Sequence, residues 1–298
     1  MPEKRTLVAI FAHPDDESYS ASGTLAYYAS LGVDVYIICA TRGEAGKISH
    51  PSLAYRDVLG AVREEELRDA CRIMGIHQPL FLGYRDSGML GTSDNNDPLS
   101  LNMAKPVDVI GKLVGLLRQL RPDVMISYYE SGPHAHPDHV SSHKYALEAF
   151  SAAGNPDMYP EQLKGPVTIF NPHRLFTVAI PTSRIEELVK AIPEDEENEP
   201  RYPYQQNQEE ETEEDEIRPE DVGIPDEDVT VYMDVGQLYE TKRKSIAAHR
   251  TQHQGEGVFS NLPEKLLKDF FSQEHFFQVA PNTNPPPRYK DLFDGIWD

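Results

Sequence analysis

Two short clusters of histidine and aspartate residues have the composition and spacing that metal-ion chemistry needs. Residues 12–17 read A-H-P-D-D-E, and residues 134–139 read H-A-H-P-D-H. Each cluster follows an apolar run typical of a buried strand. Two imidazoles and one carboxylate form a ligand set that leaves a fourth position on zinc open for water, as in catalytic zinc sites. The two clusters together therefore predict one catalytic metal site, without cysteine ligands.

The spacing within each cluster suggests how the work is divided. His13 and Asp16 are three residues apart, a distance that aims both side chains at one point in a turn or first helical turn. The pair His136 and His139 repeats it. Because three ligands suffice, the neighbouring side chains are free. A metal-activated water needs a general base within hydrogen-bond reach, and we assign that role to Asp15. A developing oxyanion needs a donor, and a protonated His136 fits.

Each cluster has a simpler interpretation when it is taken alone. Asp15, Asp16 or Asp138 could merely cap a helix N-terminus, where unpaired N–H groups stabilise carboxylates. An isolated histidine after a strand is usually a loop residue. Two such clusters that meet in one crevice favour the metal site over the helix caps.

The elements that must position the clusters alternate between strand and helix. Such alternation predicts an α/β fold: a Rossmann-like, mostly parallel sheet with helices on both faces. In the commonest strand order the first and fourth strands are neighbours, so the two clusters would meet at the carboxyl edge of the sheet. No G-x-G-x-x-G follows the first strand, which disfavours NAD binding. The expected strands are 6–12, 33–41, 79–82 and 124–127, and the expected helices are 21–31, 62–74, 107–120 and 140–150.

The pattern of alternating strands and helices weakens after residue 150, and we divide the chain at residue 165. Residues 1–165 are predicted to form the Rossmann-like catalytic core, and residues 166–298 a smaller C-terminal α+β extension that completes the site. Within the extension we expect an acidic, mobile insertion at 193–228 and an extended, proline-rich arm from Pro281, packed on the body or on a neighbour. The other expected elements are strands 166–170, 175–180 and 229–235, and helices 239–250 and 263–271.

Composition limits the classes of function. The formal net charge of the chain is -21, and residues 194–228 contain seventeen acidic and two basic residues. A repulsive field of this kind disfavours nucleic-acid binding. Cys39 and Cys71 lie in apolar or helical patterns and predict buried, reduced thiols. With no apolar run long enough for a membrane span and no signal-peptide pattern, we expect a cytoplasmic protein. The sequence leaves the oligomeric state open, including a homo-oligomer.

At the two clusters the chain closely resembles the PIG-L and LmbE family of zinc-dependent N-acetylglucosaminyl deacetylases. The shared motifs are A-H-P-D-D-E at 12–17 and H-P-D-H at 136–139. The resemblance implies zinc held by His13, Asp16 and His139. It also implies Asp15 as general base, and His136 as the group that polarises the carbonyl and stabilises the oxyanion. The choice of His139 over His136 as a ligand rests on this resemblance.

Further matches suggest the substrate. The Gly43-Glu44 turn, Arg63 and Glu66, the run 84–89 around Asp86, and residues 248–252 look most like the branch that deacetylates the glucosaminyl-inositol precursor of mycothiol or cleaves mycothiol S-conjugates. By that resemblance Glu44, Arg63 and Asp86 contact the substrate, although a helix salt bridge for Arg63 and a turn role for Asp86 stay open. His134 stands where that branch commonly has tyrosine, and is either a second donor or an exposed loop residue.

These observations predict a metal-dependent amide hydrolase that removes the N-acetyl group from a small GlcNAc-inositol-like glycoside. Zinc is the expected metal, and Fe²⁺ could occupy the same set of two histidines and one carboxylate. Two alternatives remain: a mycothiol S-conjugate-type amidase with the same site, and a catalytically silent sugar- or metal-binding protein. The second is disfavoured because binding alone does not need Asp15. A metal-dependent phosphoesterase is weaker still, because the carboxylates for a second metal are missing.

Overall fold

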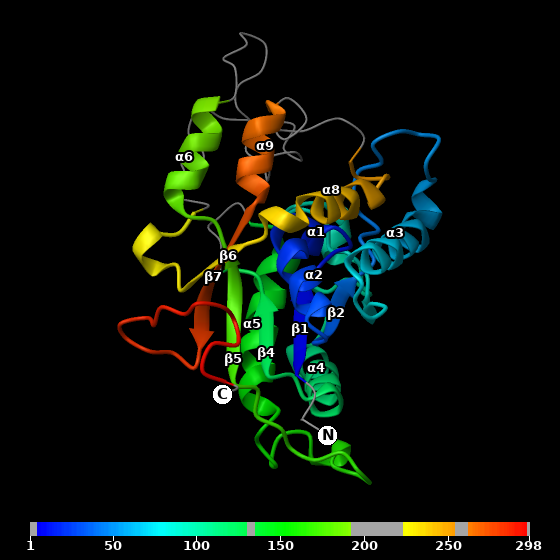
Figure 1. Cartoon of the computed structure of the whole chain (residues 1–298). Helices are drawn as coiled ribbons and strands as arrows, with labels where there is room; N and C mark the ends of the chain where they lie inside the picture. Colours follow the sequence, from blue (N-terminus) through cyan, green and yellow to red (C-terminus); the bar gives the residue numbers. More distant parts are fainter. Residues whose placement is uncertain (1–4, 130–134, 192–222, 254–261, 297–298) are drawn as a thin grey trace.

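A single mixed sheet forms the centre of the molecule (Figure 1). The computed structural model describes residues 5–129, 135–191, 223–253 and 262–296, and within them seven strands pair in the order β3-β2-β1-β4-β5-β7-β6. Neighbouring strands are parallel from β3 to β5, and β7 runs antiparallel to both of its neighbours. The strands are β1 (Thr6–Phe11), β2 (Asp34–Thr41), β3 (Leu80–Tyr84), β4 (Val124–Ser127), β5 (Arg174–Ala179), β6 (Val231–Asp234) and β7 (Gln273–Ala280).

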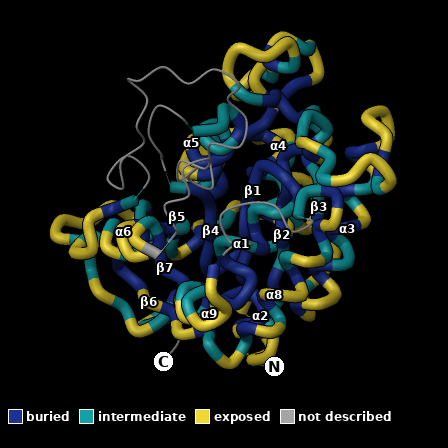
Figure 2. The backbone as a smooth tube through the Cα atoms, turned by 90° about the horizontal axis from the view of Figure 1, so that it is seen from above, coloured by how far each residue is buried: buried dark blue, intermediate teal, exposed yellow. Residues whose placement is uncertain are grey.

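Helices cover both faces of the sheet, as the alternation of elements predicts. Leu7, Ala9 and Phe11 of β1 pack in one apolar layer with α2 and α3, whereas Val8 and Ile10 pack in the other with α4 and α5. Successive side chains of a strand point to opposite faces, so β1 supplies both layers and is buried throughout (Figure 2). The helices are α1 (Asp16–Ser20), α2 (Ser22–Ser30), α3 (Leu59–Met74), α4 (Pro106–Leu120), α5 (Pro137–Ala152), α6 (Thr182–Ala191), α8 (Tyr239–Ala248) and α9 (Glu264–Phe271).

The predicted α/β class and the neighbouring position of the first and fourth strands are confirmed. Leu7 of β1 pairs with Val124 of β4, and the order β3-β2-β1-β4-β5 is that of the first five strands of a Rossmann sheet. The carboxyl ends of β1 and β4 therefore form one edge. Both cysteines, Cys39 and Cys71, are buried and unbridged, as expected.

Two predictions for the C-terminal region are wrong. Residues 166–170 form no strand: their surface is largely exposed, and β5 already occupies the place beside β4. Residues 273–280 form β7, which the sequence analysis did not assign, between β5 and β6. The C-terminal strands thus continue the central sheet. The division at residue 165 stays a prediction, and most of the expected acidic insertion, 192–222, lies outside the described residues.

The proline-rich arm packs on the body of the same chain. Leu292 and Phe293 are buried, and the Phe293 ring contacts Tyr28 of α2 at a centroid distance of 4.9 Å. Arg174 at the start of β5 donates to the carbonyl of Asp294. In the part of the chain that the structure describes, no helix is long and apolar enough to cross a membrane.

Candidate functional site

The fold brings the two predicted clusters together at the carboxyl ends of β1 and β4. His13 follows β1, Asp16 begins α1, and His139 lies in the first turn of α5. Proline at the first position of α5 starts that helix directly after His136, which occupies the N-cap. His134 lies outside the described residues, so its predicted role is not placed.

Donor atoms of three residues lie at the mutual distances of metal ligands. His139 Nε2 is 3.3 Å from His13 Nδ1 and 3.3 Å from Asp16 Oδ1. His13 Nδ1 is 3.5 Å from Asp16 Oδ2. A tetrahedral site with bonds of about 2.0–2.1 Å has ligand atoms about 3.3–3.4 Å apart. The side chains of His13, Asp16 and His139 therefore fit a tetrahedral metal ion.

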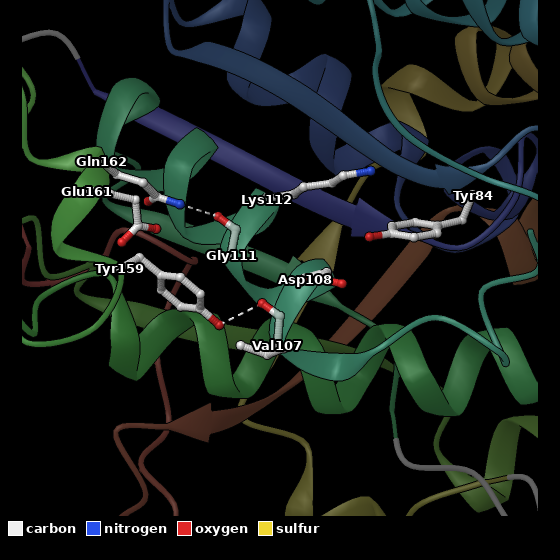
Figure 3. Close-up of a pocket in the computed structure, with 8 residues that line it drawn as sticks. All are labelled: Tyr84, Val107, Asp108, Gly111, Lys112, Tyr159, Glu161 and Gln162. Carbon is white, nitrogen blue, oxygen red and sulfur yellow. Dashed lines mark hydrogen bonds between the residues drawn. The ribbon is translucent and has the colours of Figure 1, made fainter.

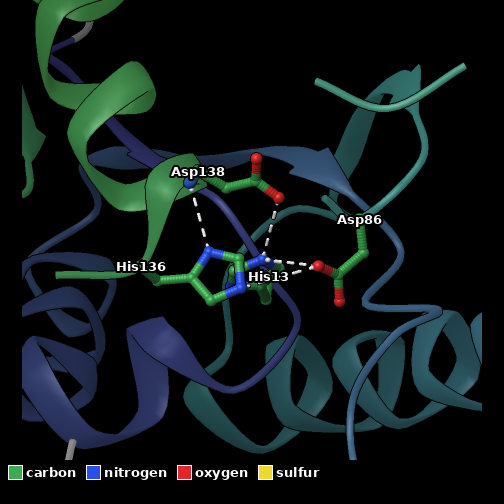
Figure 4. A group of neighbouring side chains, drawn as sticks. All are labelled: His13, Asp86, His136 and Asp138. Carbon is green, nitrogen blue, oxygen red and sulfur yellow. Dashed lines mark hydrogen bonds and ion pairs between the residues drawn. The ribbon is translucent and has the colours of Figure 1, made fainter. Parts of the chain in front are cut away.

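The other ring nitrogen of His13 faces a second pair of carboxylates (Figure 4). His13 Nε2 lies 3.3 Å from Asp138 Oδ2 and 3.5 Å from Asp86 Oδ1. A metal-ligating histidine commonly donates its second N–H to a carboxylate, which fixes the ring and its tautomer. Asp138 and Asp86 are suited to that supporting role. A second group of possible ligands consists of His13, Asp86, His136 and Asp138. Because Nε2 of His13 faces the carboxylates of Asp86 and Asp138, its Nδ1 is left for the metal, which favours the set with Asp16 and His139.

Backbone N–H groups hold the two supporting carboxylates in place. The N–H of Ser87 donates to Asp138 Oδ2 at 2.9 Å. Asp86 accepts from the N–H groups of Gly88, at 2.8 Å, and Ala45, at 3.1 Å. The loop after β3 is therefore part of the site, because it carries Asp86 and donates a hydrogen bond from Ser87 to Asp138.

The electrostatics of the donor set favour a cation. Burial opposes protonation of His13, but the carboxylates of Asp86, Asp138 and Asp16 outweigh it and raise the pKa of His13 well above its ordinary value. Burial likewise acts to raise the pKa of Asp16, but the rings of His139 and His13 hold it well below the usual range. The carboxylates thus draw positive charge into the cluster, and a bound metal ion supplies such charge.

His136 is oriented as a neutral donor. Its Nδ1 accepts the N–H of Asp138 at 3.1 Å, so Nε2 carries the proton and points toward Asp86 Oδ1, 3.7 Å away. Burial and the neighbouring rings of His13 and His139 lower the pKa of His136 to about 3. The ring therefore offers an N–H at neutral pH in place of the positive charge that the sequence analysis expected.

Asp15 lies beside the ligands with its backbone in the left-handed region, at φ 117°. Its Oδ2 is 3.3 Å from the Arg63 guanidinium and 3.3 Å from His253 Nε2. Burial acts to raise the pKa of Asp15, but Arg63 and His253 outweigh it and lower the pKa. Asp15 is therefore ionised at neutral pH, as a general base must be before it accepts a proton.

Arg63 is a buried support for this loop. It is 3% exposed and donates to the carbonyls of Pro14, at 2.6 Å, and Gly43, at 2.8 Å. Gly43 has φ +67°, and a Cβ there would lie 2.2 Å from the guanidinium, so only glycine leaves room. Glu44 accepts the N–H of Asp86 and pairs with Arg42. Contact of Arg63, Glu44 and Asp86 with a substrate stays a prediction.

The run 248–252 connects α8 to the first cluster. His249 Nε2 lies 2.9 Å from Glu17 Oε1, whose carboxylate also accepts the N–H of Asp15. The N–H and hydroxyl of Thr251 both donate to the Glu66 carboxylate on α3. These buried contacts place the end of α8 against the loop that carries the ligands.

Two aromatic or imidazole side chains of the site were missed by the sequence analysis. The ring of Tyr128 stacks on His139 with a centroid distance of 4.1 Å and an interplanar angle of 12°. Its position directly after a predicted strand was an available signal. His253 contacts Asp15 although the two residues are 238 positions apart in the sequence, and no local sequence pattern predicts such a contact.

A surface pocket lies elsewhere, between α4 and the turn at 159–162 (Figure 3). Its volume is about 700 Å³, and none of the candidate metal ligands lines it. The Lys112 ammonium near it donates to the carbonyl of Leu82, and the Tyr159 hydroxyl donates to the carbonyl of Val107. These groups serve the packing of the fold.

Known proteins are similar to this chain over the region that carries both clusters. A family model described as GlcNAc-PI de-N-acetylase matches residues 8–150, which include both clusters. The chain is 31% identical to a 1D-myo-inositol 2-acetamido-2-deoxy-alpha-D-glucopyranoside deacetylase from Thermobifida fusca, over 97% of this chain and 99% of that protein. The chain belongs to the PIG-L family. A protein of the same name from Acidothermus cellulolyticus is 32% identical to this PIG-L family chain, over 98% of its length and 95% of the relative.

Solved structures show the same fold. An N,N'-diacetylchitobiose deacetylase from Pyrococcus horikoshii superposes with a TM-score of 0.63 and 20% identity, covering 95% of this chain and 89% of that one. GalB, a 4-carboxy-2-hydroxymuconate hydratase from Pseudomonas putida, superposes with a TM-score of 0.58 and 16% identity, covering 94% and 98%. Because a deacetylase and a hydratase share this fold, the function of this PIG-L family member must be argued from its site.

Proposed function

We propose that the protein is a metal-dependent deacetylase that removes the acetyl group from the N-acetylglucosamine unit of a GlcNAc-inositol-like glycoside. The observation that carries the proposal is the approach of His13, Asp16 and His139, whose donor atoms lie 3.3–3.5 Å apart with a different oxygen of Asp16 facing each ring, beside an ionised Asp15. The full-length relatives named as deacetylases of an inositol glycoside support the substrate class.

The metal would be held by His13 Nδ1, Asp16 and His139 Nε2. Zinc suits two imidazoles and one carboxylate, and Fe²⁺ accepts the same set. A metal in this position supplies a Lewis acid for the acetyl oxygen and brings the pKa of a water close to 7. Asp138 and Asp86 accept the second N–H of His13 and so keep its Nδ1 directed at the metal.

Asp15 moves the proton. As base it takes a proton from the attacking water, and as acid it returns that proton to the amide nitrogen while the carbon–nitrogen bond breaks, so that acetate and a free amine leave. Arg63 holds the Asp15 carboxylate in its ionised form before the attack. Asp15 can act first as base and then as acid because its carboxylate is again ionised at the end of the reaction cycle.

His136 would stabilise the oxygen on which negative charge develops. Its Nε2–H points into the site because Nδ1 is already used by the N–H of Asp138. A neutral N–H directed at that oxygen stabilises the transition state, in which the oxygen is negatively charged, more than it stabilises the planar amide of the bound substrate. Burial and the rings of His13 and His139 lower the pKa of His136 to about 3, so the ring offers a neutral N–H.

A mycothiol S-conjugate-type amidase is the second candidate, because the same residues would hydrolyse a larger amide. The closeness of the full-length relatives named as deacetylases favours the acetyl group over it. The catalytically silent binding protein is disfavoured by Asp15, which a binding site does not need. The cytoplasmic location and the oligomeric state stay predictions from the sequence.

The test is acetate release by the zinc-loaded protein from GlcNAc-inositol, GlcNAc, GlcNAc-malate and chitobiose. We expect the highest kcat/KM for GlcNAc-inositol. His139→Ala should lose the metal, measured by elemental analysis, whereas His173→Ala at an exposed histidine should keep it. Acetate release from none of the four compounds would refute the deacetylase, and unchanged metal in His139→Ala would refute the ligand set.

A further inference from the structure

The carboxylate of Asp15 contacts a second nitrogen group besides Arg63. His253 follows α8 and places its Nε2 3.3 Å from Asp15 Oδ2. The hydroxyl of Tyr19, in α1, lies 2.8 Å from the opposite ring nitrogen, Nδ1. The Tyr19 and His253 rings also meet edge to face, with centroids 4.7 Å apart. Tyr19, His253 and Asp15 therefore form a chain that ends on the candidate base.

We propose that His253, oriented by Tyr19, is a positioning residue that holds the Asp15 carboxylate in the rotamer needed for proton transfer. The proposal rests on the proposed function of Asp15 as general base. No role for His253 follows from the sequence motifs, because it lies beyond the matched run 248–252.

The direction of the chain follows from the donors available. Burial, with the nearby Asp15 carboxylate, raises the pKa of Tyr19, so its hydroxyl keeps its proton and can donate to Nδ1 of His253. With Nδ1 accepting, Nε2 is the nitrogen that carries a proton, and it lies 3.3 Å from Asp15 Oδ2. The side chain of His253 is 23% exposed, so burial alone does not select one tautomer of the ring. The hydrogen bond with the Tyr19 hydroxyl selects it.

Both contacts of the Asp15 side chain go to the same oxygen. Arg63 and His253 each approach Oδ2, and among the described residues no contact is made by Oδ1. The terminal torsion of an aspartate is broad, so a carboxylate held from one side only can swing. Two nitrogen groups, Arg63 from α3 and His253 from beyond α8, each lie 3.3 Å from Oδ2 and restrict the swing of the carboxylate. Oδ1 is then presented to the water and, later, to the leaving nitrogen.

His253 transfers no proton in this proposal. Asp15 Oδ1 takes the proton of the water and returns it to the amine, while Nε2–H stays on His253 throughout. The benefit is geometric: a misplacement of a reacting group by about 1 Å can reduce the rate about 100-fold. The expected signature is a change in kcat at constant KM, because His253 touches the base and not the substrate.

The test compares His253→Leu, which removes the donor, with His253→Gln, whose amide nitrogen can take the place of Nε2. We expect kcat for acetate release to fall about 10- to 100-fold in His253→Leu, with KM within about twofold, and most of it to return in His253→Gln. Tyr19→Phe should give a smaller loss of kcat. Metal content and melting temperature should stay at the wild-type values.

The chain offers a matched control. His77 Nε2 lies 2.8 Å from Asp34 Oδ1 and its ring stacks on Tyr36, but this pair is at the amino end of β2, opposite the site. His77→Leu should leave kcat unchanged. Wild-type kcat in His253→Leu would overturn the proposal. So would an effect on KM alone, or a His253→Gln variant as slow as His253→Leu.

A measurement without turnover separates this proposal from the proposed function. In the zinc-loaded protein, ¹⁵N NMR of the imidazole should show His253 protonated at Nε2, and Asp15→Asn should shift that resonance while leaving His77 unshifted. A His253 signal that is protonated at Nδ1, or that ignores Asp15→Asn, overturns the positioning contact. If no substrate releases acetate, the deacetylase fails and this spectrum alone decides the contact.

Discussion

Two carboxylates in the molecule each face a cationic side chain, but they differ in how many of their oxygen atoms are in use. Glu274 in β7 accepts the N–H groups of Gly23 and Thr24 at the start of α2 and also the ammonium of Lys242 in α8. Its side chain is 2% exposed. Asp15 is 17% exposed and uses only Oδ2 in contacts with Arg63 and His253, within the part of the chain that is described.

The difference separates a structural carboxylate from one available for chemistry. Both oxygens of Glu274 are occupied, and its contacts tie α2, α8 and β7 together. Three of the roughly four acceptor positions of the Glu274 carboxylate are filled, so a proton from water would compete with bonds that hold the fold. Asp15 has one oxygen held and one oxygen open, which is the arrangement that a general base needs. Occupancy of the oxygens, more than proximity to a cation, therefore distinguishes the two.

The largest effect should come from Asp15→Asn, which keeps the shape of the side chain and removes the base. We expect kcat for acetate release to fall about 10²- to 10⁴-fold, the range that general acid–base catalysis contributes. Metal content should stay near the wild-type value, because Asp15 is not a ligand. Acetate release and elemental analysis on the same sample measure both. Wild-type turnover in this variant would make Asp15 a structural carboxylate like Glu274.

The second prediction tests the structural side of the comparison. Lys242→Met leaves the buried Glu274 without its counter-charge, and we expect the free energy of unfolding in urea to fall by about 3–5 kcal/mol. Adding Glu274→Gln should recover part of this loss: no buried charge remains and the amide oxygen still accepts one of the two N–H groups at the start of α2, whereas the other N–H would face the amide NH2 and lose its acceptor. In the folded fraction kcat should not change. A loss of kcat at full stability would place this pair in the catalytic machinery.

The third prediction concerns pH and the same structural region. Burial, with Arg184 and Lys242 nearby, lowers the pKa of His275 in β7 to about 4. The unfolded chain, with an ordinary pKa of about 6.5, binds the proton first as pH falls. The contribution of His275 is therefore fully present above pH 6.5 and is lost between about pH 6.5 and 4, for a total of about 3 kcal/mol.

Urea unfolding at several pH values checks this effect, with His275→Gln as the matched variant. The variant should show a flatter dependence of stability on pH in that window. Equal slopes for the two proteins would show that His275 is not the group responsible, and that the β7 region titrates through another residue.

Much of the sheet could be predicted because its strands are short, buried on both faces and separated by clear helices. Strands β1, β2 and β4 and helices α3, α4 and α5 lie where the apolar patterns predict them. The pattern failed in two segments of the C-terminal region. Residues 166–170 are apolar in sequence but pair with no strand among the described residues. Strand β7 begins with the polar residues Gln273 and Glu274, so its sequence does not show the apolar pattern of a strand that lies between two others.

The site could be predicted in part for a similar reason. His13, Asp15, Asp16, His136 and His139 come in local motifs at strand ends, and the neighbouring position of β1 and β4 brings them together. The support for these residues is not local. The partners of Asp15 and Glu17 come from α3 and from the end of α8, and no spacing in the sequence links them.

The sequence by itself determined the chemistry that this PIG-L family protein can offer: imidazoles and carboxylates at strand ends, in motifs that identify the family. Only the tertiary structure decided which atom of each residue faces which partner. The tautomer of His136, the open oxygen of Asp15 and the contact with His253 depend on side chains brought together across long stretches of chain. Hydrogen bonds and ion pairs require distances of about 3 Å, and only folding sets those distances.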